Sequence, residues 1–289
     1  MSDSEHRPTL GIISPAGGLP DAEFDAGLAA LEKFGFGGKV FSHARERLGY
    51  LSASVEARAA DLTAAWNDPD VDAVLCSRGG FGSAHLLPLL DWAELKRRPV
   101  PLLGYSDITA LHLAMDKLAV GVPIAAPMLR HFPDLDEKSL ASLLDVLIGN
   151  DHELPEVEEL TVLSGFSGRP LAGNLTVMAS LLGTACFPDP SGRVLVLEEV
   201  GEPLYRIDRA LTQLEQAGVF AACSGVVFGS FSEGDFTGAQ LRELLFRVVK
   251  NARKPAVSGF PFGHRLPFCA LSFDATLEVR GGKILQLFD

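Results

Sequence analysis

Short apolar runs alternate with segments of helical spacing along the first half of the chain. The runs lie at 9–14, 39–41, 71–76, 100–103 and 122–125. Each is short and bounded by turn residues, which predicts strands. Apolar residues recur at helical spacing in the segments 21–34 and 54–67, which predicts two amphipathic helices. Strands that alternate with helices indicate a parallel sheet covered on both faces.

An acidic segment without apolar periodicity divides the chain. Residues 134–147 have the pattern of an amphipathic helix, whereas 149–160 are rich in Asp and Glu. We interpret 149–160 as a linker between an N-terminal domain, 1–148, and a C-terminal domain, 161–289.

The C-terminal half repeats the alternation and then changes character. Its expected strands lie at 193–200, 224–229 and 256–259, and its expected helices at 203–217 and 238–249. Within 171–182, Gly173 and Asn174 open a further helix. The final residues, 269–288, alternate like antiparallel strands. The predicted fold is α/β with two domains: an N-terminal parallel sheet flanked by helices, and a C-terminal mixed α/β domain with antiparallel terminal strands.

Composition excludes several classes of partner. The net charge of −12 argues against nucleic acid, which needs concentrated Lys and Arg. No apolar run reaches membrane-spanning length, and no basic segment followed by an apolar one is visible at the start, so we expect a cytoplasmic protein. The four cysteines lack CxxC spacing and fit buried free thiols in a reducing compartment. No His or Cys pair has ligand spacing, so no metal is expected.

The stretch from Pro101 to His112 places a serine where a nucleophile can act. An apolar strand ends at Gly104, Ser106 and Asp107 follow, and helical spacing then continues. A serine on such a turn lies beside the first free N–H groups of a helix, which can stabilise an oxyanion. The alternative is that Ser106 only caps the helix.

A glycine-rich loop, Cys76 to Ser83, follows the preceding strand. Its glycines allow close approach of the backbone to a ligand. A phosphate cradle and a plain loop are both possible interpretations, although neither GxxxxGK[ST] nor GxGxxG occurs. We favour an oxyanion hole in which an N–H of Gly79 or Gly80 joins that of Asp107.

Two further stretches carry possible chemistry. Glu198 and Glu199 interrupt an apolar strand, where a carboxylate is costly unless it is paired. The alternative is an edge strand with both acids solvated. His264 follows a strand in a loop bounded by glycine and proline, where a lone histidine is usually only a surface residue.

Five strings along the chain resemble the LD-carboxypeptidase family. They are SRGGFGS (77–83), LLGYSDITALHLAM (102–115), LAGNLTVMASLLGT (171–184), LVLEEVGEPLYRIDRALTQLEQAGVF (195–220) and GFPFGH (259–264). The similarity runs in the same order through nearly the whole chain. The chain departs from the family at Ala125 to Met128, where relatives often have His-Gly-Pro, and in the more apolar stretch after His264.

The resemblance implies a serine peptidase with a Ser–Glu–His triad. By matching position, the triad is Ser106, Glu198 and His264, with Glu198 preferred over Glu199. The resemblance also implies that the serine lies on the first domain and the other two residues on the second, with the site in the cleft between domains. It implies a homodimer and no cofactor.

The implied function is release of terminal D-alanine from murein tetrapeptides in cell-wall recycling. The resemblance leaves a related alternative, a microcin-immunity-type hydrolase of peptidyl-nucleotide-like compounds. A non-catalytic protein that binds a small molecule is an alternative from another class; turnover of a peptide separates it from the enzymes.

A carboxypeptidase must also bind the free carboxyl terminus of its substrate. Arg78 is the best candidate, because it adjoins the expected oxyanion donors and its guanidinium can grip a carboxylate with two hydrogen bonds. The alternative is that Arg78 only packs on its loop or pairs with Asp107. Arg206 and Arg209 are rivals, although Asp208 between them suggests a structural salt bridge.

Overall fold

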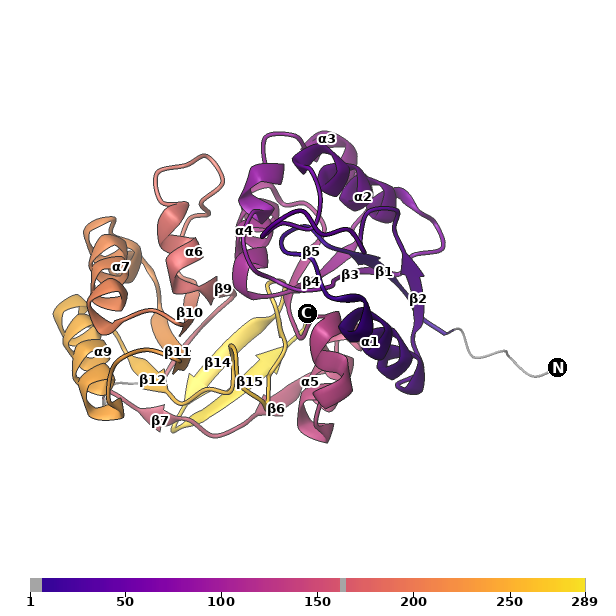
Figure 1. Ribbon diagram of the computed structural model, residues 1–289. Helices are drawn as coiled ribbons and strands as arrows, with labels where there is room; N and C mark the ends of the chain where they lie inside the picture. Colours follow the sequence, from indigo (N-terminus) through magenta and orange to yellow (C-terminus); the bar gives the residue numbers. More distant parts are fainter. Residues whose placement is uncertain (1–6, 162–164, 289) are drawn as a thin grey trace. The chain divides into compact units, whose positions relative to one another are not determined.

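The computed structural model describes residues 7–161 and 165–288. The chain divides into two compact units, Met1–Leu135 and Asp136–Asp289. Figure 1 labels their elements.

A parallel sheet forms the centre of the first unit. Its strands run in the order β5-β4-β3-β1-β2, and all four neighbouring pairs are parallel. The strands are β1 (Thr9–Ile13), β2 (Gly37–Val40), β3 (Ala73–Cys76), β4 (Pro101–Gly104) and β5 (Val122–Ala125). β2 and β3 pair with β1 on opposite sides, so the connection from β1 to β2 and the connection from β2 to β3 run in opposite directions across the sheet. Right-handed crossovers therefore place the helix that follows β1 and the helix that follows β2 on opposite faces.

Helices cover both faces of this sheet, as Figure 1 shows for α1 and α2. The α-helices are α1 (Asp21–Lys33), α2 (Val55–Asn67), the short α3 (Trp92–Leu95) and α4 (Thr109–Leu118). Three 3₁₀ turns are η1 (Ser83–Leu86), η2 (Ser106–Ile108) and η3 (Leu129–Asp134). The strands β3 and β4 are buried almost throughout, as expected for a sheet covered on both sides.

The second unit contains two sheets. The first has the order β7-β12-β11-β10-β9, parallel except at β7. Its strands are β7 (Glu158–Glu159), β9 (Pro170–Asn174), β10 (Val194–Val200), β11 (Gly225–Ser232) and β12 (Ala256–Ser258). The second is antiparallel, with the order β6-β15-β14-β8. Its strands are β6 (His152–Leu154), β8 (Phe166–Gly168), β14 (Thr276–Arg280) and β15 (Lys283–Leu287).

The helices of this unit are α5 (Glu137–Ile148), α6 (Leu175–Ser180), α7 (Leu204–Gln216), α8 (Val219–Ala222) and α9 (Gly238–Ala252); the short strand β13 covers Leu271–Ser272. The predicted fold class is therefore confirmed: a parallel sheet flanked by helices, then a mixed α/β unit with antiparallel terminal strands.

The segment 149–160 differs from the irregular linker expected from its acidity. It contains β6 and β7, which pair with β15 and β12. Glu158 and Glu159 are exposed on an edge strand, while Leu154 and Leu160 are buried and anchor the segment. Charged residues on an edge strand discourage pairing with other chains. They also leave the strand without the apolar periodicity by which a strand is predicted.

Two other boundaries also differ from those expected. Helix α5, expected in the first domain, groups with the second unit, where Ser139 and Ser142 accept hydrogen bonds from the backbone N–H groups of Phe268 and Ala270. Within 171–182, Asn174 does begin a helix, since its side chain caps α6. The residues before it form the buried strand β9 instead.

The cysteines are all free thiols. Cys76, Cys223 and Cys269 are buried, and Cys186 is half-buried. Burial raises the pKa of Cys269 to about 12 and that of Cys223 to about 11, and it raises the pKa of Cys76 and Cys186 as well.

Candidate active site

Ser106 lies at the carboxyl end of β4, on a strained turn. The strand ends at Gly104, Tyr105 is extended, and Ser106 then has a φ of 63°. A residue with a Cβ seldom adopts this left-handed conformation, and such strain concentrates at functional sites. The residues at the N-cap positions of η2 and α4 are Tyr105 and Ile108, so Ser106 is not the helix cap that the alternative interpretation required.

Gly79 of the glycine-rich loop lies directly against this serine. A Cβ added to Gly79 would stand 3.0 Å from Ser106 Cβ, 3.1 Å from Ser106 Oγ and 3.5 Å from the Asp107 amide nitrogen. The loop approaches so closely because β3 and β4 are neighbouring parallel strands whose carboxyl ends share one edge of the sheet. Among the described residues, no backbone hydrogen bond outside helices and strands is donated by Gly79, Gly80 or Asp107.

Asp107 ties the loop to the nucleophile turn. Its carboxylate Oδ2 accepts a hydrogen bond from the Ser83 amide at 2.8 Å, and its carbonyl accepts one from Ser83 Oγ at 2.6 Å. Both residues are buried. The Asp107 side chain is therefore occupied with the loop, and Arg78 is not its partner.

Arg58, which the sequence analysis missed, braces the same loop from α2. Its guanidinium is buried and Nη1 donates to the carbonyls of Gly82 and Pro15, at 2.8 and 2.7 Å. Burial lowers the pKa of Arg58, and Asp107 opposes this effect. The signal was available: Arg58 falls between Val55 and Leu62 on the apolar stripe of the predicted helix.

Arg78 lines a small cavity of about 300 Å³ beside the loop. Nη1 donates to the Gly18 carbonyl at 3.3 Å, and Nε is buried without a partner. Burial and repulsion from Arg130 lower the pKa of Arg78. The cavity also carries a second cation, Arg47, and its remaining lining residues are Gly18, Gly49, Tyr50, Leu51, Gly80 and Phe81. A half-buried cation with unused donor capacity suits an anionic ligand.

Glu198 and His264 form a close pair within the second unit. His264 Nδ1 lies 2.7 Å from Glu198 Oε2, and the Glu198 side chain is fully buried. Burial raises the pKa of Glu198, and the hydrogen bond from His264 opposes that rise. A buried carboxylate on Nδ1 fixes the tautomer of the ring, which leaves Nε2 to accept a proton.

Glu199 has a different environment, and the solvated-edge alternative for the two acids is wrong. The strand β10 lies between β9 and β11, and Glu198 and Glu199 are both buried. Glu199 Oε1 accepts hydrogen bonds from the Asn174 amide and the Val200 N–H, and Oε2 accepts from the N–H and hydroxyl of Thr176. Glu199 therefore joins β10 to the start of α6.

The other histidines of the described chain have structural partners. His112 is buried and bonds the Leu102 carbonyl. His131 Nδ1 accepts from the Met128 amide, while its Nε2 contacts the Tyr105 hydroxyl at 3.1 Å. His43 pairs with Asp61 at 2.8 Å, and that carboxylate raises the pKa of His43. The His43–Asp61 pair was not expected from the sequence, because its two residues lie on different elements.

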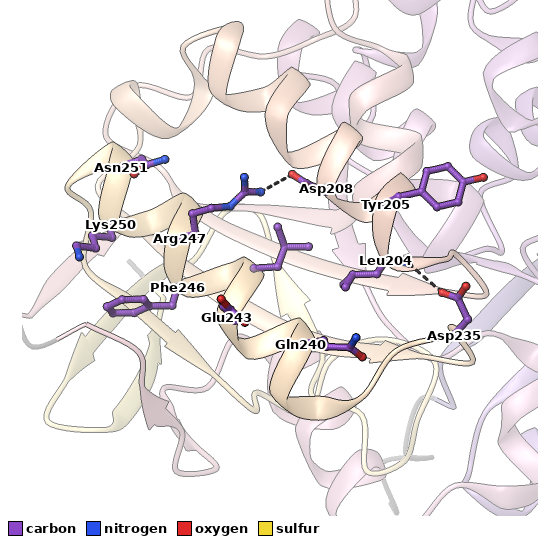
Figure 2. Close-up of a pocket in the computed structure, with 11 residues that line it drawn as sticks. Leu204, Tyr205, Asp208, Asp235, Gln240, Glu243, Phe246, Arg247, Lys250 and Asn251 are labelled. Atoms are coloured by element: carbon purple, nitrogen blue, oxygen red, sulfur yellow. Dashed lines mark hydrogen bonds and ion pairs between the residues drawn. The ribbon is translucent and has the colours of Figure 1, made fainter.

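A larger cavity, of about 800 Å³, lies between α7 and α9 (Figure 2). None of the predicted site residues lines it. The rival arginines also lie on α7: Arg206 pairs with Glu202, and Arg209 stacks on Tyr205. Asp208 does form a salt bridge, but its partner is Arg247 of α9 and not Arg206 or Arg209.

Residues 7–161 and 165–288 contain neither a membrane-spanning helix nor a cluster of metal ligands. No helix there is long and apolar enough to cross a membrane. No group of three or more His, Cys, Asp or Glu side chains there could hold a metal ion.

Comparison with known proteins identifies relatives over the whole chain. A curated murein tetrapeptide carboxypeptidase of Pseudomonas aeruginosa is 33% identical, covering 98% of this chain and 97% of its own. The crystal structure of muramoyltetrapeptide carboxypeptidase from Oxalobacter formigenes superimposes with a TM-score of 0.88 at 28% identity, covering 97% of this chain and 99% of its own. An MccF-like protein from Bacillus anthracis shares the fold, with a TM-score of 0.89 at 23% identity, covering 99% and 98% of the two chains.

Family models agree with these relatives. The model of the LD-carboxypeptidase N-terminal domain matches residues 10–124, and that of the LD-carboxypeptidase C-terminal domain matches residues 167–279. The chain therefore belongs to the LD-carboxypeptidase family.

Proposed function

We propose that this protein is a serine LD-carboxypeptidase that releases terminal D-alanine from murein tetrapeptides. The scissile bond joins the L-configured centre of meso-diaminopimelate to D-alanine. The observation that carries the proposal is the 2.7 Å contact between His264 Nδ1 and the buried Glu198. Such a pair is the activating half of a serine triad, and it occurs in a member of the LD-carboxypeptidase family.

In the proposed mechanism, Ser106 is the nucleophile and His264 the base. A serine hydroxyl attacks poorly at neutral pH unless a base removes its proton. His264 Nε2 takes that proton as Ser106 Oγ bonds to the carbonyl carbon, and then gives it to the departing amine of D-alanine. Water, deprotonated by His264, hydrolyses the acyl-enzyme and regenerates Ser106. Glu198 orients the ring and stabilises the imidazolium.

The glycine-rich loop supplies the proposed oxyanion hole. The tetrahedral intermediate carries a negative charge on the former carbonyl oxygen, which preorganised N–H groups stabilise. The Asp107 amide is one proposed donor, and that of Gly79 or Gly80 is the other. The close approach of Gly79 to Ser106 Oγ supports this assignment.

Arg78 is the proposed receptor for the terminal carboxylate. It carries the unpartnered, buried Nε described above and lines the cavity beside Gly80. Arg47 on the same cavity adds positive charge, which favours an anionic end group over an amide in a protein whose net charge is −12.

The test is mass spectrometry of a murein tetrapeptide after incubation with the protein. We expect loss of one alanine, abolished by Ser106→Ala and slowed on the order of 10³-fold or more by His264→Ala. A peptidyl-nucleotide-like compound assayed in parallel tests the microcin-immunity alternative. Preferential turnover of that compound, or binding of the tetrapeptide without turnover, would contradict the proposal.

Location and assembly complete the proposal. The family resemblance implies a cytoplasmic homodimer. Cell fractionation tests the location, and light scattering during size-exclusion chromatography tests the assembly.

A further inference from the structure

The strand β11 carries an extra residue opposite Glu198. The register between β10 and β11 shifts between Leu197 and Glu199, so that Gly229 and Ser230 both face the single residue Glu198. The two strands are neighbours in the sheet (Figure 1). Such β-bulges bend a strand and re-aim its side chains, and they are frequent next to active sites.

The bulge also anchors the loop that carries His264. The Ser230 amide donates to the Phe262 carbonyl at 2.8 Å. A Cβ on Gly229 would stand only 2.4 Å from that same oxygen, so the approach requires glycine there. The bulge thus fixes the backbone two residues before the histidine.

Two buried oxygens at the bulge have no partner. They are Ser230 Oγ and Glu198 Oε1. A Cβ on Gly263 would lie 2.4 Å from Ser230 Oγ and 2.8 Å from Glu198 Oε2, so hydroxyl and carboxylate flank the same glycine. Ser230 Oγ therefore lies within about 5 Å of this carboxylate, a span that one bridging water can cross. Buried polar atoms are nearly always satisfied, which favours such a link.

Several other groups act on Glu198. His264 holds Oε2, and Glu199, its neighbour on β10, repels it. Asn174 of β9 lies opposite Glu198; its side-chain amide donates to Glu199 Oε1, and hydrogen bonding from the same amide lowers the pKa of Glu198. Glu198 Oε1 nevertheless has no partner, and the Ser230 hydroxyl is an unpartnered donor near it.

We propose that Ser230 is a positioning residue whose hydroxyl is linked to Glu198 Oε1 through one bridging water and so directs Oε2 at His264 Nδ1. The effect of Ser230 on catalysis rests on the proposed function. The contacts among Ser230, Glu198 and His264 do not, because all three residues lie within the second unit.

The test follows the Nδ1–H proton of His264 by NMR as the pH is varied, in the wild type and in Ser230→Ala. Without the hydroxyl, the less stabilised carboxylate should hold the imidazolium proton more strongly. We expect the midpoint of this titration to rise by about half a unit to one unit, and kcat to fall about tenfold with little change in KM. Ser230→Cys, which keeps the volume and a weak donor, should lie between the two.

Ser232→Ala is the matched control. Ser232 lies two residues further along β11, and its hydroxyl is likewise buried without a partner. We expect Ser232→Ala to leave the midpoint of the His264 titration and kcat unchanged. An unchanged midpoint in Ser230→Ala, or an equal shift in Ser232→Ala, would overturn the inference. If Ser230→Ala does not fold, Ser230→Cys decides in the same way.

The two proposals fail separately. The resonance is read on the folded protein without substrate. If the wild type releases no alanine, the proposed function is wrong, and the titration still decides whether Ser230 positions Glu198.

Discussion

At the scale of single residues, Ser106 combines a reactive hydroxyl with an unfavourable backbone. Its φ of 63° suits glycine better than any residue with a Cβ. We therefore expect Ser106→Gly to be more stable to urea than Ser106→Ala, by about 1 kcal/mol, with both variants inactive. Equal unfolding free energies for the two variants would show that the turn carries no strain.

Arg78 offers a second prediction at this scale, on specificity. Lysine keeps the charge but cannot form the paired hydrogen bonds of a guanidinium with a carboxylate. We expect Arg78→Lys to lower kcat/KM for the free-acid tetrapeptide, and much less for a tetrapeptide ending in D-alanine amide. Equal losses on both substrates would instead assign Arg78 to holding the loop.

At the scale of elements, β10 carries two adjacent acids with separate duties. Glu198→Gln should fold normally yet lose on the order of 10³-fold or more in kcat, because the amide orients His264 poorly. Glu199→Gln should keep kcat per folded molecule but unfold more easily, by about 1–3 kcal/mol, because the four hydrogen bonds to its carboxylate cannot all persist. Steady-state kinetics and urea unfolding of both variants check this. The reverse pattern would move the catalytic role to Glu199.

Sequence patterns predicted the elements that are long or apolar. The strands β1, β3, β4 and β5 have short buried runs, and α1 and α2 have clear spacing, so local physics determines them. The strands β6 and β7 were not predicted, because two or three residues with exposed acids on an edge give no periodic signal. The strand β9 was not predicted because Gly173 and Asn174 resemble the start of a helix, although only Asn174 begins one.

The candidate site was harder to predict from the sequence than the fold. The turn at Ser106 and the glycine loop were visible as local motifs. The pairing of Glu198 with His264 joins residues 66 positions apart, so it rested on family resemblance. The left-handed φ of Ser106 and the bulge at Ser230 are consequences of tertiary packing, which no single-sequence pattern encodes.

At the scale of the whole molecule, buried His112 links stability to pH. Burial lowers its pKa to about 4, although the bond to the Leu102 carbonyl opposes this. Between about pH 6.5 and 4, the unfolded chain therefore binds a proton that the folded one does not, and stability falls as the pH drops. Relative to His112→Gln, the wild type should lose about 2 to 3 kcal/mol between pH 7 and 4.5 in urea unfolding. Parallel curves for the two proteins would exclude this role.

The environment of the native thiols has a practical consequence. Alkylation needs a thiolate that the reagent can reach, and Cys76, Cys223 and Cys269 are buried with raised pKa values. Burial raises the pKa of Cys186 as well, but this residue is only half-buried. A single exposed cysteine introduced by mutation can therefore carry a fluorophore or spin label once Cys186 is replaced, with the other three native thiols left in place.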